Sequence, residues 1–357
     1  MPLELLQGSE ALAASAIAAG CRFFAGYPML PFTGLLEEMS KQLPAVGGTC
    51  INAASEIEGV NMVLGAAGAG ARAATGSCGQ GVALMQAAIG EAAQTEIPLV
   101  IFNMARGQQE YFQCTRGGGW GDYRTITLAP RDVAEAVEHT QLVFHLADLY
   151  RAPVILYGDY LIADTQMSVD VSPLDFGPLP AKDWAVTGRN GGGGDPGGHR
   201  ILNVRSGWGR PTDLTENWSG VADKFRRIGQ TEARHESLHT EDAEHLVVSW
   251  GTASAFVDHV VEELRADGVR LGSFRPVTLW PFPEDALNAA AEGCRQVLTF
   301  EINAGQMTDD VRLAVGRQTP VIPLGGVSLD SSTLRQGPLL TAGELRCRLV
   351  AAIEGER

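Results

Sequence analysis

The sequence predicts two doubly wound α/β domains joined by an irregular connection. Helical and extended patterns alternate from residue 9 to about residue 165, and a second alternating series starts near residue 244. Alternation at this spacing is typical of parallel sheets covered by helices. Residues 166–235 interrupt it with glycine- and proline-rich stretches. We therefore expect domains over 1–165 and 236–357, with 166–235 as a linker and a helix.

The first domain is predicted to alternate short apolar strands with helices. PLVIFNMAR (98–106) is almost continuously apolar, as expected for a strand buried on both faces of a parallel sheet. The N-terminal segment reads as a short amphipathic helix. The expected helices are 11–19, 56–68, 82–93 and 133–150, and the expected strands lie within 21–28, 71–78, 98–106, 124–130 and 152–159.

The second domain repeats this pattern after the linker. Its expected strands lie within 245–251, 269–283 and 296–303, and its expected helices are 252–268 and a short one that includes 309–315. The linker contains TGRNGGGGDPGG (187–198). This cluster lacks the flanking strand and helix of a phosphate-binding turn, so we interpret it as a disordered surface loop.

Composition narrows the class of protein. The 357 residues are 45% hydrophobic and 19% charged, with a formal net charge of −15. That charge argues against a nucleic-acid partner and against an anionic membrane surface. We find no apolar run long enough to span a membrane and no basic leader before the first apolar run. A cytoplasmic enzyme that handles small anions is the expectation.

Several cofactor motifs are missing from the sequence. No two of the six cysteines stand in CxxC spacing, which argues against a zinc site or an iron–sulfur cluster held by this chain. The cysteines are also widely scattered, which argues against a disulfide framework. We find no P-loop, no GxGxxG fingerprint and no EF-hand loop. The GDG that opens a diphosphate- and magnesium-binding motif is also absent.

The chemistry is expected at the carboxyl ends of the strands, where open parallel sheets bind ligands. Four such ends carry unusual residues: 26–33, 54–59, 75–81 and 103–124. The last is longer than a connector needs and contains three consecutive glycines and four aromatic residues. It is either a flexible surface loop or a lid over a site.

Glu56 raises the sharpest question in the sequence. It follows Ala53, Ala54 and Ser55 and opens a predicted helix. A carboxylate in the first turn can simply complement the helix macrodipole. The alternative is a functional acid placed among small apolar neighbours at the mouth of the helix.

The strand-end segments resemble the α subunit of the 2-oxoacid:ferredoxin oxidoreductases, most closely the 3-methyl-2-oxobutanoate (2-ketoisovalerate) type. The resemblance covers almost the whole chain outside the glycine-rich linker. It is carried by AGYPMLP, SEIEGVNMVLGAAGAGARA, TGSCGQGVALMQ, EYFQCTRGGGWGDYR, FRPVTLWPFP and EINAGQMTDDVRLAV.

The resemblance implies a division of labour between subunits. This chain would supply a domain that binds the pyrimidine of thiamine diphosphate and a transketolase C-terminal-like domain. A separate β subunit would carry the diphosphate and Mg²⁺ site, which explains the missing GDG. A ferredoxin-like subunit or ferredoxin would hold the Fe–S clusters, which explains the missing CxxC.

The resemblance also assigns residues. In the family, a glutamate hydrogen-bonded to pyrimidine N1′ favours the imino tautomer, whose 4′-nitrogen takes the thiazolium C2 proton; such a carboxyl needs a desolvated pocket. Here that residue is Glu56, whereas Glu58 points to a different helix face. Arg106 matches the arginine that holds the substrate carboxylate through a guanidinium fork. The resemblance places Tyr27, Pro28, Gly79 and Gly81 at the cofactor, and Leu30, Phe112 and Cys114 at the substrate.

The sequence departs from the family at the first strand end. Most relatives read GYPITPS, with a threonine hydroxyl near the substrate, whereas this chain reads GYPMLPF with Leu30 in that place. Thr33 cannot simply replace the lost hydroxyl. Met29, Leu30 and Phe32 make this wall more apolar, so we hypothesise an acyl group larger or more hydrophobic than that of pyruvate, branched or aromatic.

The expected function is therefore oxidative decarboxylation of a 2-oxoacid to an acyl-CoA, with electrons passed to ferredoxin. The chain alone is expected to be inactive. Two alternatives remain open at this point: a subunit of a non-oxidative thiamine-dependent decarboxylase or synthase, and a non-catalytic paralogue that kept the fold.

Overall fold

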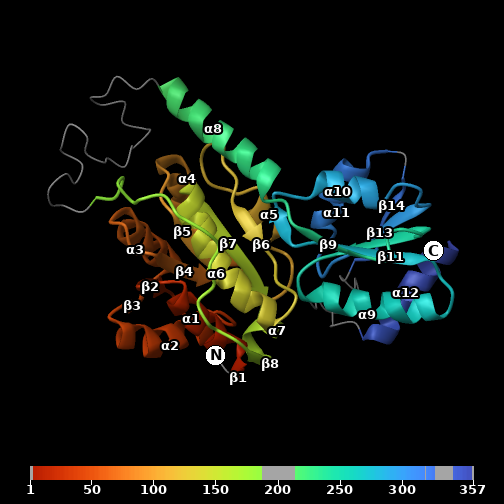
Figure 1. Ribbon diagram of the computed structural model, residues 1–357, viewed down its shortest axis with the longest axis horizontal. Helices are drawn as coiled ribbons and strands as arrows, with labels where there is room; N and C mark the ends of the chain where they lie inside the picture. Colours follow the sequence, from red (N-terminus) through yellow and green to blue (C-terminus); the bar gives the residue numbers. More distant parts are fainter. Residues whose placement is uncertain (1–2, 187–213, 318, 326–340, 356–357) are drawn as a thin grey trace. The chain divides into compact units, whose positions relative to one another are not determined.

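The computed structural model describes residues 3–186, 214–317, 319–325 and 341–355 and divides the chain into two compact units (Figure 1). Unit 1 comprises Met1–Arg106 and Gln113–Thr231. Unit 2 comprises Gly107–Phe112 and Glu232–Arg357. A short segment from the middle of the chain thus belongs to the second unit.

The strands of unit 1 form a parallel sheet in the order β6-β7-β5-β4-β2-β3. Every residue of the long central strands β5 and β7 is buried, as the apolar run at 98–106 predicted. The strands are β2 (Phe23–Gly26), β3 (Thr49–Asn52), β4 (Ala73–Ser77), β5 (Leu99–Ala105), β6 (Ile126–Leu128) and β7 (Pro153–Asp159).

Helices cover this sheet in two packed groups. In one, α1 packs against α2 and α6; in the other, α3 packs against α4. The helices of unit 1 are α1 (Gly8–Ala18), α2 (Thr33–Gln42), the 3₁₀ turn η1 (Leu43–Val46), α3 (Glu56–Gly68), α4 (Gln80–Thr95), α6 (Val133–Tyr150), α7 (Tyr160–Asp164) and α8 (Leu214–Thr231); the short α5 (Tyr111–Thr115) begins where the chain returns from unit 2.

The two ends of the first predicted domain differ from expectation. The N-terminal segment begins as a strand, β1 (Glu4–Gln7), which pairs antiparallel with β8 (Gln166–Val169). The helix that follows, α1, is not amphipathic as predicted but buried on most sides, because it packs under both α2 and α6. The predicted linker accordingly begins with a strand. Residues 171–180 are irregular, as expected, whereas the glycine cluster at 187–198 lies outside the described residues.

Unit 2 is a second, smaller α/β unit. Its sheet has the order β14-β13-β10-β11-β9, with β9 antiparallel to β11 and the other pairs parallel. The strands are β9 (His235–Leu238), β10 (His245–Ser249), β11 (Leu271–Pro276), β13 (Gln296–Phe300) and β14 (Val321–Pro323), with a short β12 (Thr278–Trp280); the helices are α9 (Thr252–Ala266), α10 (Glu284–Ala290), α11 (Gln306–Val315) and α12 (Ala342–Glu354).

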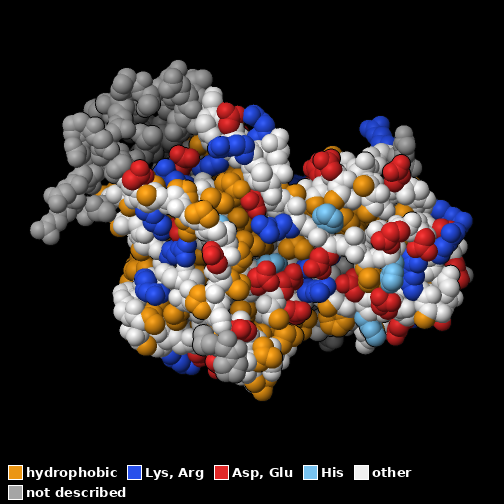
Figure 2. Space-filling model, in the orientation of Figure 1, with side chains coloured by type: hydrophobic (Ala, Val, Ile, Leu, Met, Phe, Trp, Pro, Cys, Tyr) orange, Lys and Arg blue, Asp and Glu red, His pale blue; other side chains and the backbone are white. Residues whose placement is uncertain are grey.

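The core of unit 2 lies between α9, α12 and the sheet. Val257 and Leu264 of α9 and Leu349 of α12 meet Val247 and Leu298 of the strands. The outer face over these helices carries acidic, basic and histidine side chains side by side (Figure 2). Arg346 forms an exposed ion pair with Glu263, and His259 lies 3.4 Å from the same carboxylate. Pairs of this kind contribute little to stability, so the buried apolar contacts hold the unit together.

Each sheet has a topological switch point, where successive crossovers leave in opposite directions. In unit 1, β2 connects to β3 on one side, and the chain then continues at β4 on the other side of β2. In unit 2, the neighbours of β10 are β11 and β13. Ligands of doubly wound proteins bind outside the carboxyl ends of the strands at such points.

Candidate functional site

The switch point of unit 1 brings together three of the four strand ends that the sequence singled out. The end of β2 leads into Tyr27–Leu30, the end of β3 leads to Glu56, and the end of β4 is Ser77. Arg106 follows the last residue of β5, the strand next to β4. The adjacent carboxyl ends of parallel strands thus gather these residues at one edge of the sheet.

Glu56 opens α3 and is almost completely buried, with 4% of its surface exposed. The preceding residue, Ser55, is the N-cap of the helix and accepts a hydrogen bond from the amide of Glu58 at 3.2 Å. The Glu58 carboxylate is exposed and accepts a hydrogen bond from the Ala54 amide at 3.1 Å. Helix capping is therefore done by Ser55 and Glu58, so Glu56 does not need to be buried for that purpose.

The Glu56 carboxylate meets a hydroxyl from the neighbouring strand end. Ser77 Oγ donates a hydrogen bond to Glu56 Oε1 at 3.1 Å, and Ser77 is fully buried. Among the described residues, the structure gives the Glu56 carboxylate no second hydrogen-bond partner. Sequence reasoning missed Ser77. The feature that could have indicated it is its position as the last residue of a buried strand, just before a turn that contains Gly79.

The two glycines predicted at the cofactor have different structural reasons. Gly79 precedes α4 with φ 51°, a backbone conformation that favours glycine. Gly81 has an ordinary φ but no room for a side chain: a Cβ there would lie 2.0 Å from Ser77 Oγ and 2.5 Å from Glu56 Oε1. Gly81 therefore allows α4 to lie directly against the Ser77–Glu56 pair.

The segment Tyr27–Leu30 leaves its side chains accessible. Tyr27 is 37% exposed, Pro28 is exposed, and the Leu30 side chain is 72% exposed. The Leu30 carbonyl, in contrast, is engaged. It accepts a hydrogen bond from Cys78 Sγ at 3.2 Å and another from Arg106 Nε at 3.1 Å. The backbone of this turn is thus tied to two strand ends while its apolar side chain remains open.

Arg106 is exposed at the end of its strand. Its Nε group is fixed by the Leu30 carbonyl, and the structure gives its two terminal nitrogens no partner among the described residues. A guanidinium held in this way presents a fork of donors, which is the geometry that binds a carboxylate with two hydrogen bonds.

Cys114 and Phe112, the other two predicted substrate residues, have surroundings different from those of Leu30 and Arg106. Cys114 is fully buried; its sulfur accepts a hydrogen bond from Asn103, and its carbonyl accepts hydrogen bonds from the hydroxyls of Thr125 and Thr127. Its role at the substrate stays a prediction. Phe112 belongs to unit 2, where its amide donates to Gln306 Oε1 at 2.9 Å, so its role at the substrate stays a prediction.

The glycine triplet of the long loop at 103–124 lies against α4. The Tyr123 hydroxyl accepts hydrogen bonds from the amides of Gly118 and Gly119 and donates to Gln86 Oε1. A Cβ on Gly119 would lie 2.2 Å from the Gln86 carbonyl oxygen. The loop is therefore anchored to the helix rather than free at the surface, while Trp120 stays 51% exposed. Its function as a lid remains a prediction.

The switch point of unit 2 holds a segment of the chain itself. Gln108 is buried and donates to the Trp250 carbonyl at 2.9 Å, after β10, while it accepts from the Ile302 amide at 2.6 Å, after β13. Asn303 Nδ2 donates to the Gln108 carbonyl at 2.7 Å, and the Tyr111 hydroxyl donates to Asp310 at 2.6 Å. The segment 107–112 thus contacts the residues that follow the carboxyl ends of β10 and β13.

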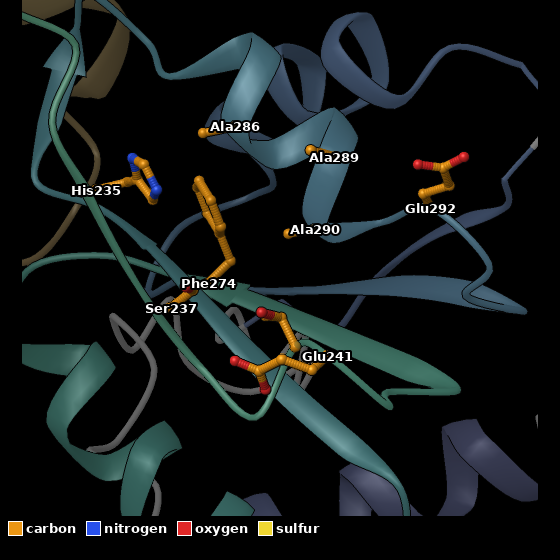
Figure 3. Close-up of a pocket in the computed structure, with 9 residues that line it drawn as sticks. His235, Ser237, Glu241, Phe274, Ala286, Ala289, Ala290 and Glu292 are labelled. Atoms are coloured by element: carbon orange, nitrogen blue, oxygen red, sulfur yellow. The ribbon is translucent and has the colours of Figure 1, made fainter.

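Unit 2 also has an open groove of about 550 Å³ between β9, β11 and α10 (Figure 3). The imidazole of His235 stacks on the buried Phe274 ring with centroids 5.1 Å apart. Ala286, Ala289 and Ala290 of α10 form the opposite wall. Glu241 and Glu292 contribute carboxylates, and no sequence-predicted site residue lines the groove. Its acidic rim does not suit an anionic substrate.

The described residues contain no group of three or more His, Cys, Asp or Glu side chains that could hold a metal ion. All six cysteines are free thiols. Burial raises the pKa of Cys21 to about 12 and the pKa of Cys50 to about 11, so neither thiol is reactive near neutral pH. No helix within the described ranges has the length and apolarity needed to cross a membrane.

Comparisons with known families define a class for this fold and site. Residues 14–184 match the family model described as "Pyruvate flavodoxin/ferredoxin oxidoreductase, thiamine diP-bdg". Residues 243–334 match "Pyruvate:ferredoxin oxidoreductase core domain II". The class is therefore a thiamine-diphosphate-binding oxidoreductase.

Individual relatives make the assignment more specific. The chain is 34% identical to "Ketoisovalerate oxidoreductase subunit VorB" of Methanothermobacter marburgensis, over 88% of this chain and 91% of the relative. It is 36% identical to "2-oxoglutarate synthase subunit KorA" of Methanothermobacter thermautotrophicus, over 87% of this chain and 91% of the relative. The chain belongs to the 2-oxoacid:ferredoxin oxidoreductase family, which confirms the resemblance. Because the two names are matched at similar identity, they do not fix the substrate.

Solved structures support the fold. The 2-oxoglutarate:ferredoxin oxidoreductase from Magnetococcus marinus, with 2-oxoglutarate, coenzyme A and succinyl-CoA bound, superimposes with a TM-score of 0.84 at 24% identity. The match covers 99% of this chain and 65% of that longer chain. A split-gene transketolase, described as an inactive beta4 tetramer, matches with a TM-score of 0.60 at 12% identity, over 99% of both chains. The predicted α/β class with parallel sheets is thus confirmed.

Proposed function

We propose that this oxidoreductase subunit binds the pyrimidine ring of thiamine diphosphate in unit 1, with Glu56 as the acid that contacts the ring. The enzyme would convert a branched-chain or other bulky 2-oxoacid to its acyl-CoA by oxidative decarboxylation and pass the electrons to ferredoxin. The observation that carries the proposal is the Glu56 carboxylate, buried at the switch point with one oxygen held by Ser77 and no further partner among the described residues.

The residues present fit the pyrimidine end of the cofactor. A buried carboxylate is costly unless it is hydrogen-bonded, and a ligand nitrogen that shares a proton with Glu56 would supply the missing contact. Gly81 keeps α4 free of a side chain at this point. Exposed Tyr27 and Pro28 lie on the adjacent strand end. When bound, thiamine diphosphate supplies the carbon centre at which a 2-oxoacid loses CO₂.

The substrate side is proposed to consist of Arg106 and Leu30. The open fork of Arg106 suits the carboxylate of a 2-oxoacid, and its Nε bond to the Leu30 carbonyl fixes its direction. The exposed Leu30 side chain offers an apolar surface beside it. An acyl group larger than that of pyruvate gains from that contact, whereas a second carboxylate would be placed against an apolar wall.

Other subunits are proposed to complete the enzyme. The sequence has no GDG motif and no CxxC pair, and the described residues form no metal cluster. We therefore assign the diphosphate and Mg²⁺ site to a β subunit, and the Fe–S clusters to a ferredoxin-like subunit or ferredoxin. Ile57 and Met62 are exposed on α3 and Leu84 is exposed on α4, and these two helices pack against each other. We propose that the β subunit covers this apolar face, since both chains must reach one cofactor.

The two units are proposed to correspond to the expected domains. Unit 1 would be the pyrimidine-binding domain, and the part of unit 2 after the linker would be the transketolase C-terminal-like domain. The match of residues 14–184 to a thiamine-diphosphate-binding family supports the first assignment. We propose no role in the reaction for the open groove of unit 2, because none of the predicted site residues lines it.

The test is reconstitution of this chain with a β subunit and a ferredoxin-like subunit of the same family. We expect the complex, with thiamine diphosphate, Mg²⁺ and coenzyme A, to reduce methyl viologen with 3-methyl-2-oxobutanoate faster than with pyruvate or 2-oxoglutarate. The chain alone is expected to be inactive. Glu56→Gln should lower kcat by at least a hundredfold, because an amide cannot share a proton with the ring in the same way.

Each rival function has its own outcome in this experiment. CO₂ release from the 2-oxoacid without any reduction of methyl viologen would indicate the non-oxidative enzyme. Full activity of Glu56→Gln would refute the role of Glu56, and an inactive complex that carries all its cofactors would indicate a non-catalytic paralogue. Faster turnover of pyruvate or 2-oxoglutarate than of every branched or aromatic oxoacid would contradict the substrate class.

A further inference from the structure

Ser77 and Glu56 form a buried pair that the sequence did not foresee. They lie 21 residues apart, at the end of β4 and the start of α3, and these two elements pack against each other. Ser77 is 0% exposed and Glu56 is 4% exposed. At this depth the carboxylate has lost most of its water, so the hydroxyl of Ser77 replaces a solvent hydrogen bond.

Among the described residues, two atoms lie near enough to the Ser77 hydroxyl to be considered as acceptors, and one of them is much the stronger acceptor. Ser77 Oγ lies 3.1 Å from Glu56 Oε1 and 3.9 Å from Met29 Sδ. A carboxylate oxygen accepts a hydrogen bond far better than a thioether sulfur does. The proton of Ser77 is therefore directed to Oε1.

Gly81 shows that the close approach is built into the fold. A Cβ at this position would be 2.0 Å from Ser77 Oγ, 2.8 Å from Ser77 Cβ and 2.5 Å from Glu56 Oε1. Any side chain on Gly81 would push the serine, the glutamate or the helix away. Because Gly81 has no side chain, α4 can lie against the hydrogen bond between Ser77 of β4 and Glu56 of α3.

We infer that Ser77 is a positioning residue for Glu56: its hydroxyl holds Oε1 and leaves Oε2 directed to the ligand. This role rests on the proposed function, because the proposed function assigns the pyrimidine ring as the ligand of Glu56. A carboxylate with one oxygen fixed cannot rotate to present either oxygen at random, which preorganises the contact before the cofactor arrives. Ser77 itself need not touch the substrate.

The first test needs no cofactor. Local opening of β4 and α3 is measured by hydrogen-exchange mass spectrometry on the full chain for Ser77→Ala, Glu56→Ala and the double variant. If the two side chains interact, the double-mutant cycle yields a coupling of about tenfold in the opening equilibrium, the size expected for a hydrogen bond to a charged group. A coupling near one would overturn the inference.

Thr75 provides the matched control for this cycle. It lies two residues before Ser77 on the same strand, is 1% exposed, and its hydroxyl has no hydrogen-bond partner within the part of the chain that the structure describes. Thr75→Val removes a buried hydroxyl without removing a contact to Glu56. Its cycle with Glu56→Ala should give a coupling near one; a coupling equal to that of Ser77 would show that the effect is general packing, and the inference would fail.

The second test uses the reconstituted complex loaded with thiamine diphosphate and Mg²⁺. Deuterium exchange at the thiazolium C2 carbon, measured by NMR after quenching, should slow about tenfold in Ser77→Ala per assembled complex, with the KM for the oxoacid within twofold. Ser77→Cys, which keeps a weaker donor, should fall between. Wild-type exchange in Ser77→Ala with a slow Glu56→Gln would refute the role of Ser77 alone. Wild-type exchange in Glu56→Gln would refute the proposed function itself and this role with it.

Discussion

Arg106 is held at one end of its guanidinium and open at the other, and this geometry predicts a substrate-specific defect. Arg106→Gln removes both charge and fork, so we expect the KM for the 2-oxoacid to rise at least tenfold, as the loss of a charge-assisted hydrogen bond of about 1.5–3 kcal/mol requires. Arg106→Lys should recover part of the loss because it keeps the charge without the fork. The measurement is steady-state kinetics of the reconstituted complex.

A second arginine separates this effect from a change in net charge. Arg226 on α8 pairs with Asp223 and is 67% exposed. Arg226→Gln changes the charge of the chain by the same amount and should leave the KM within twofold. Equal KM values for wild type and Arg106→Gln would contradict the proposed contact with the substrate carboxylate.

At the residue scale, some residues of the candidate site can be predicted from sequence motifs and others cannot. Glu56 and Arg106 were assigned from motifs, because each stands at a recognisable strand or helix boundary. Ser77 was not, because its contact with Glu56 depends on how α3 and β4 pack, which no local pattern encodes. Cys114 also lies within a motif, and the structure adds its hydrogen bond with Asn103, which the motif does not predict. A motif gives the residue types near a site but not which side chains contact one another there.

At the scale of elements, the segment Gly107–Phe112 is expected to be a stable part of unit 2. Gln108→Ala would leave the Ile302 amide and the Trp250 carbonyl without their buried partner, at a cost of about 1–3 kcal/mol for each group. We expect amide exchange to accelerate at least tenfold in 107–112 and around 300–303, with β7 unchanged. Hydrogen-exchange mass spectrometry of the full chain measures this.

Gln109 is the matched control for that substitution. It is half-buried, and it takes part in this cluster through its carbonyl, which accepts a hydrogen bond from Gln306. Gln109→Ala keeps that carbonyl and should leave exchange in both regions near the wild-type rate. Equal acceleration in the two variants would mean that the segment is held by its backbone and not by the Gln108 side chain.

The elements also show what the sequence can and cannot predict. Helices α3 and α6 have the expected bounds, because a capping side chain at Ser55 or Asp132 precedes an apolar repeat in each. The pair β1–β8 was missed because its two strands are short and pair across most of unit 1. Strand β9 was missed for a related reason: it is an exposed antiparallel edge, so it lacks the apolar run that marks a buried strand.

At the scale of the whole molecule, the proposed assembly makes the last prediction. Met62 on α3 and Leu84 on α4 are 38% and 49% exposed on two helices that pack against each other, and exposed apolar side chains that lie together mark interaction surfaces. In Met62→Glu/Leu84→Glu, two carboxylates would be desolvated by a bound β subunit without partners, at a cost of several kcal/mol. We expect co-purification with the β subunit to fall more than tenfold, while the isolated variant keeps its thermal stability.

Leu313 on α11 of unit 2 serves as the control, since its side chain is 73% exposed and therefore also accepts a carboxylate without a folding cost. Leu313→Glu should assemble normally. Undiminished capture of the β subunit by the α3/α4 double variant would place the partner elsewhere on the chain, and Glu56 would then have to share its cofactor across a different face. Loss of assembly in the double variant alone would place the β subunit on α3 and α4, and α3 is the helix that Glu56 opens.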